Sequence, residues 1–250
     1  MDLRLKDKVA FICGGASPTG REISANFVKE GAKLFLTDIM IDQGKELADE
    51  LISKGGDVLF AKMDVSGYQE VASTVKQAEA HFGRVDILVF VTGYAIPGKF
   101  VESGLESWKK QVDVNLYGML NVTHALLPGM IERKYGKVVS LMGDSSRIGE
   151  NNLSVLAAAR AGQIGLIKSL AKEVGRFNIT LNGVSLGILD TSHHKPGFIE
   201  KNREKLVRPY PLGRLGMPED VAPMVLLLCS DRSSWITGQI ISVNGGFAMV

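Results

Sequence analysis

Cysteine is scarce in this sequence. Only Cys13 and Cys229 carry thiols in a chain of 250 residues, which is too few for a disulfide framework. The four histidines and the two cysteines show none of the clustered spacing that is typical of zinc ligands. We therefore expect neither a structural disulfide nor a metal site.

An excess of charge of one sign and long apolar runs are also missing. The 29 basic and 27 acidic residues give a formal net charge of +2, and no run of like charges stands out, which argues against a nucleic-acid partner. No stretch reaches the roughly 18 apolar residues that a membrane span needs, and the first eight residues have no apolar core. We expect a cytoplasmic protein that does not associate with a membrane.

What the sequence does contain is an alternation of short apolar runs with longer amphipathic stretches. This pattern is typical of repeated βα units. Each run is apolar throughout and does not alternate between apolar and polar residues. Both faces of the sheet are therefore expected to be covered by helices. We predict an α/β fold with one domain, residues 1–250, built on a Rossmann-like, doubly wound parallel sheet. The predicted strands are Val9–Cys13, Lys33–Thr37, Val58–Lys62, Ile87–Val91, Lys137–Leu141, Thr180–Val184 and Ile240–Val243.

The amphipathic stretches predict the helices, and one segment between them is irregular. Proline and glycine punctuate Leu189–Arg214, which predicts a mobile excursion above the sheet of the kind that often covers a site. The predicted helices lie near Thr19–Glu30, Asp42–Lys54, Gln69–Phe82, Leu105–Glu132, Leu153–Gly175 and Glu219–Ser230.

A glycine-rich turn, Cys13–Gly20, follows the first strand, where dinucleotide-binding chains place the start of a helix. The turn resembles that of the classical short-chain dehydrogenase/reductase family, Thr-Gly-x-x-x-Gly-x-Gly, and keeps Gly14 and Gly20. Pro18 replaces the middle glycine, which adds a ring and removes an N–H donor where the pyrophosphate would approach. Ser17 and Pro18 also make a good helix start, and we favour this structural explanation over a working anion site.

Two acidic residues and a short segment indicate which cofactor the fold would take and whether this chain binds it. Asp38 lies about 20 residues beyond the turn, where an acidic side chain accepts hydrogen bonds from the ribose of NAD rather than NADP. Asp64 resembles the family residue beside the adenine, although it could equally be a helix N-cap. The family's Asn-Asn-Ala-Gly is replaced by Phe90-Val91-Thr92-Gly93. We expect this chain to bind no cofactor itself and regard Gly14, Gly20, Asp38 and Asp64 as vestigial.

The catalytic residues of the family can be located by position. The segment Ala161–Ala171 resembles the helix that follows the family's Tyr-x-x-x-Lys. Counting back places Lys on Arg160, Tyr on Leu156 and the family's Ser on Gly143, so the proton donor and both of its partners are replaced. Asn115 remains of the usual tetrad, but in this fold it also has a structural role in its helix. The resemblance therefore implies a degenerate member with no catalytic residues and no dehydrogenase activity of its own.

Other residues could in principle supply different chemistry. Asp144, Ser145 and Ser146 follow the fifth strand, and we favour a solvated turn over a catalytic role for them. His193 and His194 form the one adjacent pair of histidines, which could act as acid and base, but exposed loop histidines are far commoner. These residues leave open a stand-alone enzyme with lyase or isomerase chemistry.

The resemblance runs from Leu5 to Val250 and is strongest in Pro211–Ala222 and Ser233–Gln239. In similar proteins these segments, and the two long helices near Leu105–Glu132 and Leu153–Gly175, form subunit contacts. A chain that keeps its assembly surfaces and loses its catalytic residues implies a partner.

The leading hypothesis is a non-catalytic subunit in a heterotetramer with a catalytically intact paralogue that binds NAD. The loop Gly143–Glu150 resembles that of dehydrogenases acting on hydroxyacyl-CoA thioesters. A third hypothesis, besides the stand-alone enzyme, is a regulator that senses NAD through Asp38 and Asp64 without turnover.

Overall fold

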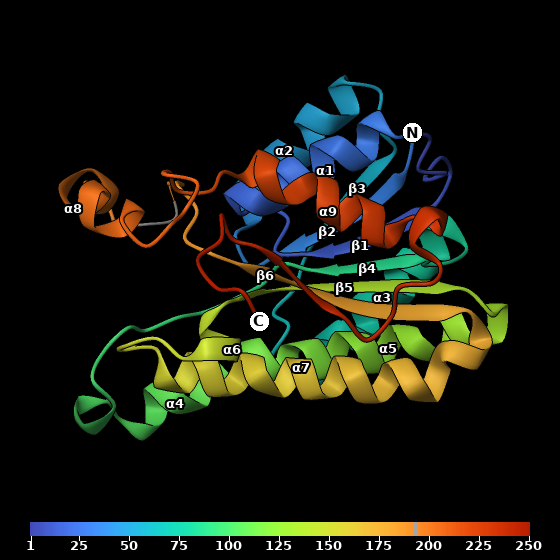
Figure 1. Ribbon diagram of the computed structural model, residues 1–250. Coiled ribbons are helices and arrows are strands. Elements are labelled where there is room, and N and C mark those ends of the chain that lie inside the picture. Colours follow the sequence, from blue (N-terminus) through green and yellow to red (C-terminus); the bar gives the residue numbers. More distant parts are fainter. Residues whose placement is uncertain (193–194) are drawn as a thin grey trace.

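A parallel sheet forms the centre of the molecule in a computed structural model that describes residues 1–192 and 195–250 (Figure 1). Within the described residues it has seven strands in the order β3-β2-β1-β4-β5-β6-β7. This confirms the predicted doubly wound, Rossmann-like α/β fold. The strands are β1 (Val9–Cys13), β2 (Lys33–Asp38), β3 (Val58–Lys62), β4 (Ile87–Phe90), β5 (Gly136–Gly143), β6 (Ile179–Leu186) and β7 (Ile240–Val243).

The register of the sheet brings the carboxyl ends of its central strands together. Cys13 of β1 is paired with Thr37 of β2 on one side and with Phe90 of β4 on the other. Strands β5 and β6 are longer than predicted, because polar residues buried within them extend the ladder to the pair of Gly143 and Leu186. The order of the strands reverses between β1 and β4, and ligands of open α/β sheets bind at such a crevice.

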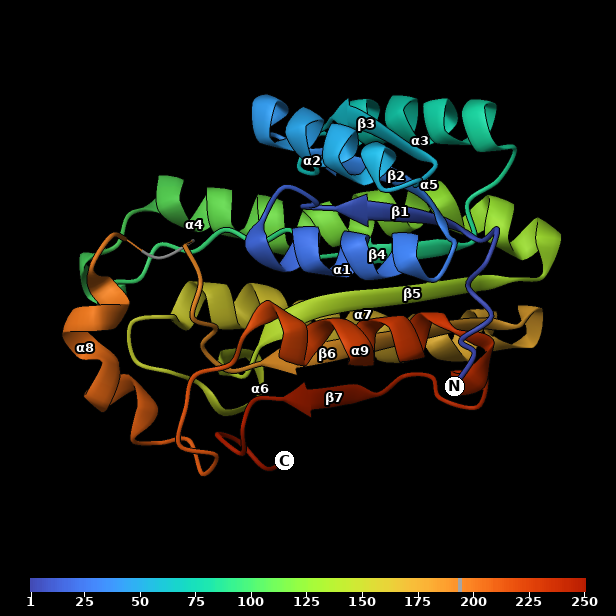
Figure 2. The ribbon, with the colours of Figure 1, turned by 90° about the horizontal axis from the view of Figure 1, so that it is seen from above.

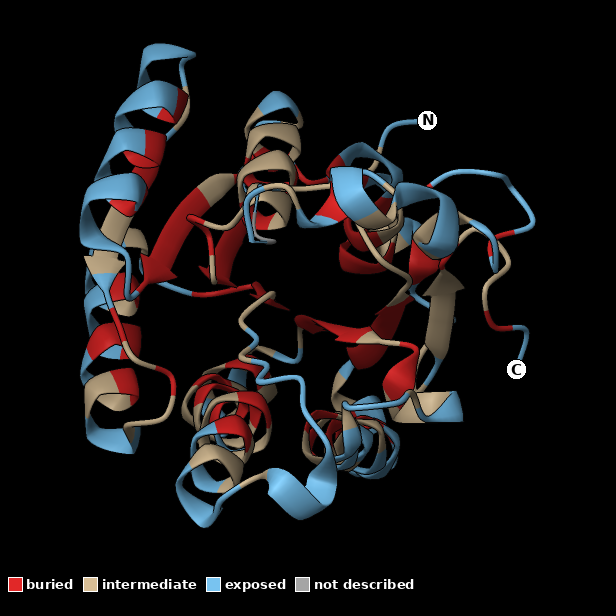
Figure 3. Cartoon of the chain, turned by 90° about the vertical axis from the view of Figure 1, so that its left-hand side faces the viewer, coloured by how far each residue is buried: buried red, intermediate tan, exposed pale blue. Residues whose placement is uncertain are grey.

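Helices cover both faces of the sheet (Figures 1 and 2). One apolar core joins the sheet to α1, α2 and α9, and a second joins it to α3, α5 and α7. Figure 3 shows the buried residues gathered on the strands and on the inward sides of these helices. The bounds are α1 (Pro18–Lys29), α2 (Ile41–Ser53), α3 (Tyr68–Phe82), α4 (Leu105–Val112), α5 (Gly118–Arg133), α6 (Ser145–Ile148), α7 (Ser154–Val174), α8 (Phe198–Val207) and α9 (Pro218–Cys229).

Two predictions about helices were wrong. The helix expected over Leu105–Glu132 is interrupted by a π-helical turn, Asp113–Tyr117, which separates α4 from α5. The irregular segment Leu189–Arg214 contains a regular helix, α8, which projects at the carboxyl end of the sheet (Figure 1). Its apolar residues are sparse, and Ile199 is its one buried residue, so the amphipathic signal in the sequence is weak.

No described helix is both long and apolar enough to cross a membrane. Within residues 1–192 and 195–250, no group of three or more histidine, cysteine or acidic side chains is placed to hold a metal ion.

Candidate functional site

The glycine-rich turn lies at the carboxyl end of β1 and is shaped by two glycines. Gly14 has a φ of +82°, and a Cβ atom there would lie 2.9 Å from the backbone nitrogen of Thr92. A Cβ atom on Gly20 would lie 2.2 Å from the carbonyl oxygen of Gly14. Both positions require glycine because the start of α1 packs directly against the turn. These two vestigial residues therefore have a structural reason to be glycine that is independent of any cofactor.

Most N–H groups of this turn are used within the protein. Pro18 has none and occupies the first position of α1, and the Ser17 hydroxyl caps the helix by accepting from Gly20 N at 3.1 Å. Within the described residues, Thr19 is the residue of the turn whose N–H has no acceptor. The others donate to Thr37 O (Gly14 and Gly15), Asp38 Oδ2 (Ala16) and Gly14 O (Ser17). A single free donor is a poor match for a dinucleotide diphosphate, which several N–H groups normally hold.

The two acidic residues assigned to the cofactor are also held locally. Asp38 is 8% exposed, and its two carboxylate oxygens accept from the backbone nitrogens of Ala16 and Met40, both at 3.0 Å. Asp64 accepts from the backbone nitrogen and the hydroxyl of Ser66 at 2.9 and 2.7 Å. Asp64 is not a helix N-cap, because α3 is capped by Gly67. Each carboxylate therefore stabilises the loop that follows its own strand.

Gly143, at the position of the family's serine, lies close to Arg160, at the position of the family's lysine. Arg160 extends from α7 between the ends of β4 and β5. A Cβ atom on Gly93 would lie 2.5 Å from Arg160 Nη2, and one on Gly143 would lie 3.1 Å from Nη1. Leu156 is buried one turn earlier on α7. The three replaced positions thus hold an aliphatic side chain, a guanidinium and a glycine, with no phenol or hydroxyl among them.

The charge of Arg160 is not neutralised by a neighbour. Its Nε atom is buried without a hydrogen-bond partner, and no described acidic residue forms an ion pair with it. Burial lowers the pKa of Arg160 to about 10, which still leaves the group protonated at neutral pH. Arg160 therefore contributes a positive charge to the site.

Asn115 lies in the π-helical turn and holds it together. Its side-chain nitrogen donates to the carbonyl oxygens of Gln111 and Tyr94, at 2.8 and 2.7 Å. The carbonyl of Asn115 accepts from Gln163 Nε2, and Gln163 Oε1 accepts from the Ser140 hydroxyl at 2.8 Å. Gln163 is completely buried. Sequence reasoning missed this residue, although a glutamine on the inward face of a long helix is an unusual signal.

Replacing Gln163 with leucine is expected to lower the free energy of unfolding by about 2 kcal/mol, because the buried Ser140 hydroxyl and Asn115 carbonyl would lose their partner. Urea unfolding at fixed protein concentration measures the change. Gln77→Leu on the exposed face of α3 is the matched control and is expected to change stability by less than about 0.5 kcal/mol. Equal effects of the two changes would contradict the role assigned to Gln163.

The segment after β5 is not the solvated turn that was predicted. Asp144 is fully buried, and its carboxylate accepts from Ser185 Oγ at 2.6 Å and from Asn244 Nδ2 at 2.7 Å. Ser145 is buried as well, and Ser146 Oγ donates to the carbonyl oxygen of Gly143 at 2.7 Å. The turn is buried because β6 and the last loop of the chain pack over it. Asp144 therefore ties three segments together.

The remaining acid-base candidates of the sequence, His193 and His194, lie outside the described residues. Glu150, which sequence reasoning did not single out, is half-buried, and burial together with the negative charge of Asp144 raises the pKa of its carboxyl.

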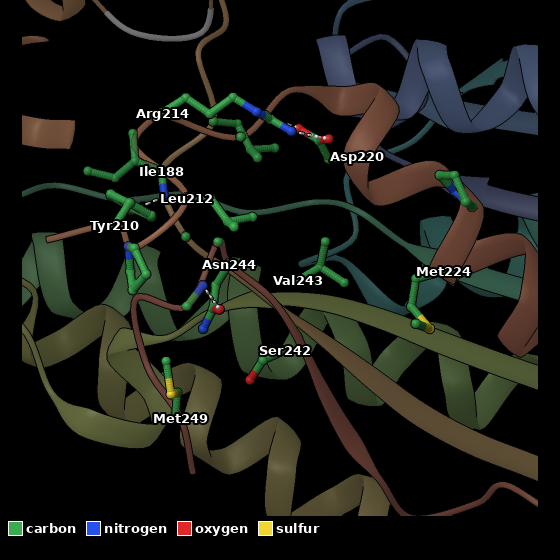
Figure 4. A pocket seen from close by; sticks show the side chains of 17 residues that line it. Ile188, Tyr210, Leu212, Arg214, Asp220, Met224, Ser242, Val243, Asn244 and Met249 are labelled. Atoms are coloured by element: carbon green, nitrogen blue, oxygen red, sulfur yellow. Dashed lines mark hydrogen bonds and ion pairs between the residues drawn. The ribbon is translucent and has the colours of Figure 1, made fainter. Parts of the chain in front are cut away.

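A mostly apolar pocket of about 600 Å³ lies between β7, α9 and the loop after β6 (Figure 4). Tyr210, Leu212 and Val243 contribute to its wall, and an ion pair between Arg214 and Asp220 closes one end at 2.6 Å. Of the predicted site residues that the structure describes, none lines it. Among the described residues, the pocket touches the candidate site through Asn244, which bonds to Asp144.

Comparisons with known proteins identify the family of this chain. Residues 14–248 match the family model described as enoyl-(acyl carrier protein) reductase. The chain belongs to the short-chain dehydrogenase/reductase family. Members of this family are typically NAD(P)-dependent oxidoreductases that act on CH–OH groups.

Individual relatives cover nearly the whole chain. A 3-oxoacyl-[acyl-carrier-protein] reductase of Chlamydia muridarum is 35% identical, over 99% of this chain and 100% of the relative. The subunit BbsD of (2S)-[(R)-hydroxy(phenyl)methyl]succinyl-CoA dehydrogenase from Thauera aromatica is 33% identical, over 97% of each chain. The crystal structure of gox2181 superposes with a TM-score of 0.94 at 32% identity, covering 98% of this chain and 97% of that one.

Proposed function

We propose that this chain is the non-catalytic subunit of a hetero-oligomeric, NAD-dependent short-chain hydroxyacyl-CoA dehydrogenase, in which an intact paralogue carries out the reaction. The observation that carries the proposal is the packing of Arg160 between Gly93 and Gly143, one turn beyond Leu156. Carbonyl reduction and its reverse need a group that gives and takes a proton at the reacting oxygen. Leucine, arginine and glycine supply none at these positions.

The cofactor belongs to the partner in this proposal. Among the described residues of the glycine-rich turn, Thr19 alone has a free N–H. Both carboxylate oxygens of Asp38, and one of Asp64, already accept hydrogen bonds from backbone N–H groups. Phe90, which stands where the family has an amide, is fully buried, and its ring lies against α5 at Gly118. The residues present do not fit a bound NAD, and we derive no hydride-transfer step in this chain.

Two exposed surfaces support a partner chain. Trp235 is 99% exposed in the segment that leads into the edge strand β7, and Leu212 and Met249 are exposed as well. Figure 2 shows β7 at the open edge of the sheet. On the other side, the outer face of α7 carries the exposed small residues Ala158, Ala161 and Gly165, where a second helix could approach closely. Large exposed apolar side chains and unpaired strand edges are features that subunit contacts commonly cover.

The substrate class in this proposal is a hydroxyacyl-CoA thioester. One relative, BbsD, is a subunit of (2S)-[(R)-hydroxy(phenyl)methyl]succinyl-CoA dehydrogenase, and the loop Gly143–Glu150 resembles that of dehydrogenases acting on hydroxyacyl-CoA thioesters. We infer that the complex could be the equivalent dehydrogenase of aromatic hydrocarbon breakdown, with this chain as its inactive subunit.

The proposal is tested by purifying the full chain alone and together with a paralogue that is encoded by a neighbouring gene and has an intact Tyr-x-x-x-Lys. We expect no NAD binding by calorimetry for the chain alone, and a mixed oligomer of defined mass when both are present. Trp235→Glu is expected to weaken the mixed oligomer at least about tenfold, since it places a charge in a desolvated contact. Ile52→Glu, at an apolar residue of α2 that is 50% exposed, is the control and should leave assembly unchanged.

Other outcomes would identify the alternatives. Clear binding of NAD by the chain alone, without turnover, would replace the proposal with a nucleotide-sensing regulator. Turnover of a thioester by the chain alone would point to lyase or isomerase chemistry, for which Glu150 is a titratable group with a raised pKa.

A further inference from the structure

Arg160 is a cation without a counter-ion in the part of the chain that the structure describes. Within residues 1–192 and 195–250, no hydrogen bond or ion pair joins Arg160 to another residue, and its Nε atom is buried without an acceptor. The surface arginines Arg203 and Arg214, by contrast, each reach a carboxylate at 2.6 Å. Removing a charge from water is unfavourable unless an opposite charge accompanies it. The charge of Arg160 is therefore uncompensated among the described residues.

Two glycines flank the guanidinium. Gly93 ends the segment after β4 and Gly143 ends β5, and any side chain on Gly93 would collide with Arg160 Nη2. The Asn115 oxygen lies 3.5 Å from the position of a Cβ on Gly93, and Ser145 Oγ lies 3.5 Å from that of a Cβ on Gly143. The Asn115 oxygen faces the backbone nitrogen of Tyr94 at 3.4 Å. The polar side chains that flank the guanidinium at these glycines are therefore neutral.

We propose that Arg160 anchors a carboxylate-binding site beside Gly93 and Gly143, and that its ligand is an organic acid, either free or carried on a thioester. A guanidinium presents two parallel N–H groups that match the two oxygens of a carboxylate. A neutral carbonyl group would leave the charge uncompensated. The site depends on Arg160 in this chain and not on a catalytic partner, so it goes beyond the subunit proposal.

Binding is measured by calorimetry and by thermal unfolding on the purified full-length chain, at constant chloride concentration. Acetate and succinate are expected to bind and to raise the melting temperature, whereas acetamide, the neutral isostere of acetate, is not. Arg160→Gln is expected to weaken carboxylate binding roughly ten- to a hundredfold, the equivalent of one charge-assisted pair. Arg160→Lys should fall between the two because it keeps the charge and loses the fork.

Arg176→Gln is the matched control, because Arg176 is an exposed arginine just beyond the end of α7. It should bind carboxylates as the wild type does. If Arg160→Gln fails to fold, Gly93→Ala replaces it: the added Cβ would lie 2.5 Å from Nη2 and must displace the guanidinium while the charge remains. The same loss of binding is expected from this variant.

Further probes separate the sources of the anion. Tighter binding of succinyl-CoA than of butyryl-CoA, lost in Arg160→Gln, would assign the site to a carboxylate carried on a thioester. Binding of succinate alone would assign it to a free acid. Equal binding of acetate and acetamide, of inorganic phosphate and succinate, or of succinate by wild type and Arg160→Gln would each overturn the proposal. A missing mixed oligomer would leave it untouched and would count only against the subunit proposal.

Discussion

Turnover by the mixed oligomer is expected to fall by roughly two to four orders of magnitude when the tyrosine of the partner's Tyr-x-x-x-Lys is changed to phenylalanine. Leu156→Met at the equivalent position of this chain is expected to change turnover by less than about twofold, since it conserves volume and removes no reacting group. The asymmetry follows from the residues present: the partner would hold the proton donor, whereas this chain holds Leu156, Arg160 and Gly143. Reduction of NAD in the presence of the hydroxyacyl-CoA substrate measures both variants.

As a control for this experiment, the number of NAD-binding sites in the mixed oligomer is counted. Calorimetry of NAD on the mixed oligomer should give one site for each partner chain and none for each copy of this chain. A loss of turnover in Leu156→Met that equals the loss in the partner's tyrosine variant would contradict the non-catalytic assignment. So would one NAD site for every subunit.

Replacing Asp144 with alanine is expected to lower the free energy of unfolding by about 3 kcal/mol. Two buried donors, Ser185 Oγ and Asn244 Nδ2, would lose a charged acceptor, and hydrogen bonds to charged groups contribute roughly 1.5 to 3 kcal/mol each. The change should appear as a lower urea midpoint with an unchanged m value. All variants are compared at one protein concentration, because the stability of a chain that assembles depends on its concentration.

Ser146→Ala is the matched control for Asp144→Ala. It removes one hydrogen bond, from Ser146 Oγ to the carbonyl of Gly143, and is expected to cost about 1 kcal/mol or less. Asp144→Asn keeps one acceptor oxygen and should fall between the two. If Asp144→Ala were as stable as the wild type, the carboxylate would not be the structural link between β5, β6 and the C-terminal loop, and a chemical role for it would have to be reconsidered.

The layers of the fold could be predicted from the sequence because they rest on local patterns. All seven strands were located within two residues at each end, since short apolar runs buried on both faces are a strong signal. The sequence did not predict the break within Leu105–Glu132. Periodicity continues through the π turn, and the hydrogen bonds that stabilise the turn come from Tyr94 and Gln163, which are distant in sequence from it.

Part of the candidate site could likewise be predicted from the sequence, and part of it only from the fold. Alignment of a motif identified Gly143, Leu156 and Arg160, since residue identity by itself says which chemical groups are present. That Asp144 is buried, that the donors of the glycine-rich turn are used internally, and that Arg160 has no counter-ion could be learned only from the fold. Burial and pairing depend on segments far apart in the chain, such as Gly93 with Arg160 and Asp144 with Asn244. The sequence determined which groups this protein lacks, and the tertiary structure decided which of the remaining groups are satisfied, because hydrogen bonds and ion pairs form between residues that only folding brings together.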